Sequence, residues 1–206
     1  MKIRTLAIIA ALALPTLAIA DDQTPTTKAT DKATDKAAKL SANDVKIVAR
    51  LHHVNQMEIE LGKLGQKTGS AAVKSYSETL EKDHQSADTD LTAFAKKHGL
   101  TTIPADKPDT DAGRQEQKDM TAAVAHLKTL KGPEFDREFL NMMVSSHDKE
   151  IARIDLAIGT TTDPDLQTLL KSVKPALQRH ADQARELQKN PQASTDQPTE
   201  KQPASR

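Results

Sequence analysis

The 206-residue chain has no cysteine and no tryptophan, and aromatic residues make up only 2% of it. Without cysteine there is no disulfide to form, even in an oxidising compartment. Lysine plus arginine equals aspartate plus glutamate at 29 each, so the formal net charge is zero. Nucleic-acid binding depends on an excess of cations over the phosphates and on stacking aromatic rings. We therefore expect no nucleic-acid partner.

Long apolar runs are also scarce, and the clearest one is near the N-terminus. Lys2 and Arg4 precede an apolar run from Leu6 to Leu14, and the small-residue pattern Ala18–Ala20 follows. This order is that of a secretory signal peptide, so we expect cleavage after Ala20 and a periplasmic or secreted mature protein. The run is too short to span a bilayer comfortably, and no later stretch approaches the required length. We expect no stable membrane insertion after cleavage.

Two segments lack the apolar residues that a core needs. Residues 21–40 contain a near-repeat of Lys, Ala, Thr and Asp, and residues 190–206 contain three prolines among Gln, Ser and Thr. Such compositions are typical of disordered segments. We expect a disordered linker over 21–40, one folded domain over 41–189 and a disordered tail over 190–206.

Inside the folded segment, apolar residues recur at spacings of three and four, which predicts helices. The β-branched, aromatic-rich alternation of strands does not occur in the sequence. Four long helices are expected, with Ser41, Ser70, Pro133 and Asp163 near their starts and Gly69, Gly99 and Gly159 as stops, and a shorter helix is expected over 114–130. Short links within each pair and a long connection between pairs indicate two antiparallel hairpins. The predicted fold is an all-α four-helix bundle with one extra short helix.

Ionisable residues interrupt the apolar stripe of every long helix: Glu58 in the first, His84 in the second, His147 and Glu150 in the third, and His180 in the fourth. Counted from the connecting turns at a rise of about 1.5 Å per residue, Glu58 and the three histidines fall near the middle of the bundle, one per helix. We therefore expect them to converge. Two other histidines, at positions 98 and 126, have no evident partners and are expected to be exposed.

Converging imidazoles and carboxylates without a thiolate suit one transition metal ion, such as Zn, Cu, Fe or Mn. The alternative is a buried polar network in which the histidines pair with Glu58, Asp83 and Glu150. Imidazole nitrogens within about 4 Å of a common point would favour the metal, and rings that point apart would favour the network.

Other kinds of site are disfavoured. Glu81 and His84 form half of a di-iron carboxylate pattern, but Val144 and Leu177 stand at the equivalent positions before the other histidines. Hydrolase and phosphate-binding motifs do not occur in the sequence. We therefore predict no catalytic nucleophile.

Several motifs, in this order, resemble the exported bacterial domain-of-unknown-function 4142 family: Met57-Glu-Ile-Glu-Leu-Gly-Lys-Leu64, Lys82-Asp-His84, Phe135-Asp-x-x-Phe139, Met143-Val-Ser-Ser-His147 and Lys174-Pro-Ala-Leu-Gln-Arg-His180. Members are often labelled outer-membrane or ferritin-like proteins. The resemblance covers residues 43 to 188 and implies a ferritin-like bundle but no activity. It marks Glu58, His84, His147 and His180, and departs at Glu81, where the family usually has an apolar residue.

The functional prediction is a periplasmic bundle that binds a metal ion or small ligand through His84, His147 and His180 with Glu58 or Glu150, for storage, stress protection or metal handling. The alternative is a metal-free structural or interaction module of the cell envelope. A third interpretation, a metal-centred oxidase or peroxidase, ranks below both. The sequence leaves open a homo-oligomer or an envelope partner.

Overall fold

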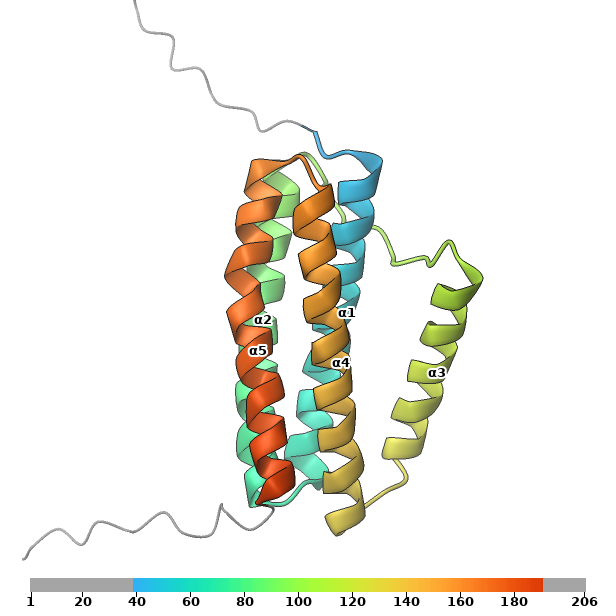
Figure 1. The fold of residues 1–206 in the computed structure, drawn as a ribbon, viewed down its shortest axis with the longest axis vertical. Helices are drawn as coiled ribbons and strands as arrows, with labels where there is room; N and C mark the ends of the chain where they lie inside the picture. The colour runs from blue at the N-terminus through green and yellow to red at the C-terminus, as the bar shows by residue number, and fades with distance from the viewer. Residues whose placement is uncertain (1–38, 191–206) are drawn as a thin grey trace, which may run out of the picture. The chain divides into compact units, whose positions relative to one another are not determined.

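The computed structural model describes residues 39–190, and within this range it contains five helices and no strand (Figure 1). The helices are α1 (Ala42–Thr68), α2 (Ala71–Lys97), α3 (Asp111–Leu127), α4 (Gly132–Thr160) and α5 (Pro164–Lys189). The all-α prediction is confirmed. The expected signal peptide, and almost all of the expected linker and tail, lie outside the described residues.

Local capping chemistry sets the helix starts that the sequence predicted. The Ser41 side chain accepts a hydrogen bond from the backbone N–H of Asp44 at 3.1 Å, and the Asp163 side chain accepts one from Leu166 at 2.8 Å. Ser70 caps α2 in the same way. Each cap satisfies an amide that the first helical turn leaves without a partner.

Two predicted boundaries were wrong. Gly159 does not stop its helix, because α4 continues through it to Thr160. A glycine ends a helix efficiently when it adopts positive φ, as Gly99 does at 86°, and Gly159 is not among the positive-φ glycines of the described chain. The short helix spans Asp111–Leu127 instead of 114–130, because the Thr110 side chain caps it one turn earlier.

The four long helices pack side by side, and α3 stands outside them next to α4 and α1 (Figure 1). Helices α1 and α2 form one antiparallel hairpin, and α4 and α5 form the other. None of the five helices of residues 39–190 combines the length and the hydrophobicity that a transmembrane span requires.

The apolar core is divided into two clusters. Toward the α1–α2 turn lie Leu61, Tyr76, Leu80, Phe135, Phe139 and Met143, and toward the α4–α5 turn lie Val48, Leu91, Ile154, Leu166 and Leu170. On each long helix, the buried polar residues of the predicted site fall between these clusters in sequence. His84, for example, lies between Leu80 and Leu91. A polar layer therefore crosses the middle of the bundle.

Helices α1 and α2 approach closely where α1 presents glycine. A Cβ built on Gly62 would lie 2.9 Å from the Cβ of Glu81, and one built on Gly65 would overlap the Ser77 hydroxyl. Both positions face the backbone or the base of a side chain in α2. The close α1–α2 contact therefore depends on the missing side chains.

We predict that Gly65→Ala lowers the free energy of unfolding by about 1–3 kcal/mol, because the added methyl overpacks the α1–α2 contact. The matched control is Gly159→Ala, at a helical position with nothing within 4 Å of the added Cβ. That change should stabilise the protein by up to about 1 kcal/mol through helix propensity. Urea unfolding of both variants tests this, and equal effects would contradict the packing argument.

Candidate metal centre

Three histidines from three helices meet in the polar layer. His84 comes from α2, His147 from α4 and His180 from α5, and their side chains are buried, at 3%, 2% and 1% exposure. The ring centroids lie 5.8 Å apart for His84 and His147, 5.4 Å for His84 and His180, and 5.3 Å for His147 and His180. The structure thus brings together the three histidines that the sequence selected.

One ring nitrogen from each histidine can be chosen so that the three atoms lie within 4.8 Å of one another. Three atoms with such separations can share a centre under about 3 Å from each, compared with a metal–nitrogen bond of about 2.0–2.1 Å. Small side-chain rotations would shorten the distance from each nitrogen to the common centre to the length of a metal–nitrogen bond. This arrangement matches the convergence criterion set for a metal rather than the diverging rings of a simple network.

In each ring one nitrogen, here termed the outer nitrogen, has an oxygen partner outside the three-histidine group, and the other is termed the inner nitrogen. The Nδ1 of His84 lies 2.9 Å from Oδ1 of Asn55, and the Nδ1 of His147 lies 2.8 Å from the backbone carbonyl of Met143. The Nε2 of His180 lies 3.0 Å from a carboxylate oxygen of Asp83. Because these oxygens only accept, the outer nitrogen is the one that carries the hydrogen in the neutral form of each ring. The inner nitrogen of each ring then carries a free lone pair.

The inner nitrogens have no hydrogen-bond partner among residues 39–190. They are Nε2 of His84, Nε2 of His147 and Nδ1 of His180, and all are buried. A buried acceptor without a donor costs free energy, so three together in a closed polar network would be unfavourable. Histidines whose outer N–H is fixed by an oxygen and whose inner nitrogen is free are the usual ligands of protein-bound metals.

Burial keeps the rings of His84 and His180 neutral. Desolvation, with a contribution from His147, lowers the pKa of His84 well below its usual value. The same two causes lower the pKa of His180 to about 4, against an opposing effect of Asp83. Neutral imidazole is the form that binds metals, because protonation occupies the lone pair. At neutral pH the site presents the metal-binding form of both rings.

Glu58 of α1 lies beside the histidines but outside the three-nitrogen group. Its side chain is 2% exposed, Oε1 accepts a hydrogen bond from the Ser146 hydroxyl at 3.2 Å, and Oε2 has no hydrogen-bond partner in the described chain. Desolvation raises the pKa of Glu58, although the nearby His147 lowers it in part. Helix α1, the one long helix that contributes no histidine to the group, therefore adds a buried carboxyl group, and one oxygen of that group has no hydrogen-bond partner in the described chain.

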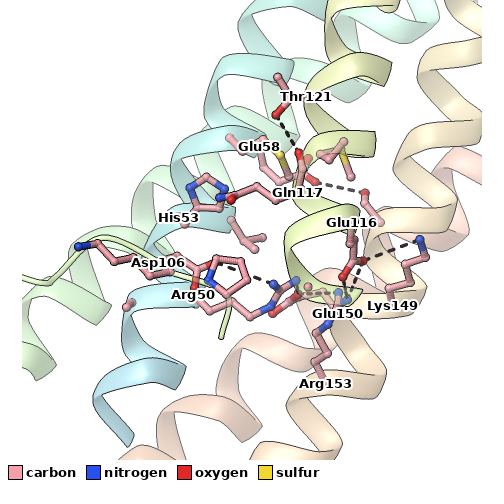
Figure 2. A pocket seen from close by; sticks show the side chains of 18 of the residues that line it. Arg50, His53, Glu58, Asp106, Glu116, Gln117, Thr121, Lys149, Glu150 and Arg153 are labelled. Carbon is pink, nitrogen blue, oxygen red and sulfur yellow. Dashed lines mark hydrogen bonds and ion pairs between the residues drawn. The ribbon is translucent and has the colours of Figure 1, made fainter. Parts of the chain in front are cut away.

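Glu150, the fifth predicted site residue, has different partners. Its carboxylate lies 3.0 Å from Nη2 of Arg50 and 3.6 Å from Nη1 of Arg153 (Figure 2). The structure pairs this buried acid with guanidinium groups of α1 and α4. It does not bring the Glu150 carboxylate into the three-histidine group.

Sequence reasoning missed Asn55, which orients His84. Asn55 stands three residues before Glu58, so both fall on the same face of α1. The three-residue spacing from Glu58 is the sequence signal that could have identified Asn55 as part of the site.

The expectation that His98 is exposed was wrong. Its ring is 4% exposed, stacks on Phe94 with centroids 4.3 Å apart, and lies 3.5 Å from Asp163 and 3.4 Å from Asp165. Asp163 caps α5 and Asp165 lies in its first turn, far from His98 in sequence, so no local pattern reveals them. His126 is exposed on α3, as predicted.

A large groove leads from the surface to the histidines. It has a volume of about 1340 Å³, runs between α3 and the α1–α4 face, and includes Glu58, His84 and His147 in its lining. The side chain of Glu116 on α3 reaches across to Arg153 on α4, with N–O distances of 2.6 and 2.5 Å (Figure 2). Two of the three histidines therefore border a space that opens to solvent.

The fold and the site define an all-α bundle with a buried three-histidine cluster. A family model described as a domain of unknown function, DUF4142, matches residues 29–187. The chain belongs to this family, as its motifs predicted. No curated protein and no solved structure matched the chain. The family description states no activity, so function has to be argued from the site.

We predict that the metal-free protein loses stability as the pH falls from 6.5 toward 4, because His180 is neutral when folded and takes up a proton more readily when unfolded. His180→Gln keeps an N–H for Asp83 but cannot titrate. Relative to this variant, the wild type should lose on the order of 3 kcal/mol across that window. Urea unfolding in chelator at several pH values measures the difference.

The control for this experiment is His126→Gln, which replaces an exposed histidine and should leave the pH profile of wild type unchanged. A pH-independent difference between wild type and His180→Gln would show that folding does not hold the His180 ring neutral.

Proposed function

We propose that this protein is a ferritin-like periplasmic bundle that binds one transition metal ion through His84, His147 and His180. The single observation that carries the proposal is the convergence of three buried imidazoles, each of which has one nitrogen without a hydrogen-bond partner in the described chain. A metal ion would accept the lone pairs of all three nitrogens. Glu58 is a buried acid whose Oε2 has no hydrogen-bond partner in the described chain, and in its ionised form it would lower the net charge of the loaded site.

The chemistry of the ligands limits which metal ions the site would bind. Three imidazoles with a nearby carboxylate and no thiolate suit Zn, Cu, Fe or Mn rather than Ca or Mg, which take oxygen ligands. One such site per chain fits metal handling or stress protection in the cell envelope better than bulk storage. A metal-free structural module of the envelope is the competing proposal, and the experiments below distinguish the two.

We predict that the purified mature protein, stripped with chelator, binds one equivalent of Zn²⁺ or Cu²⁺ in calorimetric titration. His147→Ala should weaken binding by more than about 100-fold, since even outer-shell partners of metal ligands contribute 10–100-fold. His126→Ala on α3 is the matched control and should bind like wild type. No micromolar binding of Zn, Cu, Fe or Mn, or unchanged affinity in His147→Ala, would refute the metal site.

We predict opposite effects of Glu58→Gln on stability and on affinity. At pH 7–8 the change removes a carboxyl group whose ionisation is disfavoured by burial, and it adds an N–H that can donate to an imidazole. The metal-free variant should therefore unfold at higher urea than wild type. Its metal affinity should fall about 10-fold, because a negative charge near the ion is lost.

If Glu58 only belongs to a structural network, Glu58→Gln will change urea stability and leave every metal affinity at the wild-type value. That result, together with undetectable metal in the protein as purified, would favour the metal-free module.

A further inference from the structure

The groove reaches one side of the histidine cluster and not the others. His84 and His147 contribute to its lining, whereas His180 does not. Solvent-exposed residues such as His53 and Lys149 line the same space. The groove therefore connects bulk solvent to the edge of the cluster between His84 and His147.

The protein supplies few ligands on this edge. Three nitrogens form the group that can hold an ion, and no carboxylate of the described chain joins it. Glu58 lies on the groove side, with its Oε1 engaged by Ser146. Three protein ligands with a fourth position turned toward an open space is the arrangement of metal sites that exchange ligands, whereas structural sites are closed by four.

Charge around the two approaches to the cluster differs in sign. The lining of the groove contains seven Lys and Arg side chains against five Asp and Glu. A smaller cavity of about 310 Å³ approaches His84 and His180 from the α2–α5 side, and its lining contains Asp83, Asp90 and Glu150 against Arg179 alone. Neutral imidazoles also leave the charge of a divalent ion uncompensated. Both features favour an anion that arrives through the groove.

We propose that the metal ion held by His84, His147 and His180 keeps one coordination position open to the groove under α3 and binds a small anion there. This inference rests on the metal site proposed above. The ligand class is a small monoanion with a lone pair for the metal, for which azide is the probe. The groove is wide enough for larger anionic molecules to bring such a group to the ion.

The test uses the full-length protein loaded with Co²⁺, whose visible absorption depends on the number and geometry of its ligands. Sodium azide is titrated at constant ionic strength. A saturable change in the cobalt bands is the expected result. Cobalt that binds one to one with bands insensitive to azide would overturn the open position and leave the metal site standing. Failure of Co²⁺ to bind, together with no micromolar binding of Zn, Cu, Fe or Mn, would instead refute the metal site itself.

A pair of variants on α3 tests the route. Ala122 lines the groove and the adjacent Ala123 does not, and both are exposed. Ala122→Trp should slow azide association in stopped-flow measurements severalfold, because the indole narrows the groove, whereas Ala123→Trp should match wild type. Equal rates in the two variants would rule out the groove as the path. Cobalt affinity should be the same in both, since neither residue belongs to the three-histidine group.

Discussion

The structure depends on how the bundle accommodates a polar layer between two apolar clusters. Three imidazoles occupy the place where a helical bundle would ordinarily pack leucine, and burial lowers the pKa of two of them, His84 and His180, so that their protonated forms are unfavourable. The layer is tolerated in part because one nitrogen of each of the three rings has a hydrogen-bond partner. The other nitrogen of each ring is a buried acceptor without a donor, which costs free energy. A bound cation is the simplest chemical group that would offset this cost.

The outer hydrogen bonds come from three chemically different oxygens. An amide oxygen holds His84, a backbone carbonyl one turn earlier holds His147, and a carboxylate holds His180. The carbonyl belongs to the same helix as its histidine, so it is available wherever that helix forms. The amide and the carboxylate come from neighbouring helices, so the orientation of those two rings depends on the assembled bundle.

Helix α3 gives the bundle an unsymmetrical surface. It covers the α1–α4 side through ion pairs such as Glu116–Arg153, and it leaves beneath it the groove that reaches His84 and His147. The opposite, α2–α5 side has only a small cavity with acidic residues around it. A buried site therefore has one wide approach with excess positive charge and one narrow approach with excess negative charge.

Local sequence determined the helices, most of their ends and the choice of the three histidines. Helical periodicity, capping residues and rise per residue act over one or two turns, and these rules placed His84, His147 and His180 at a common depth before any contact was known. The family motifs marked the same residues. Gly159 showed the limit of such rules, because a glycine stops a helix only where its backbone leaves the helical conformation, as Gly69 does with ψ 167° and Gly99 with φ 86°.

Tertiary structure decided which polar groups meet. Glu150 shares its helix face with His147, yet the carboxylate pairs with Arg50, which lies 100 positions away in sequence. His98 is buried against the start of α5, and Asn55 reaches His84 across a helix interface. Spacing along one helix fixes the face on which a side chain lies. Which partner it finds there depends on the side chains that other helices bring to that face, and no local pattern contains that information.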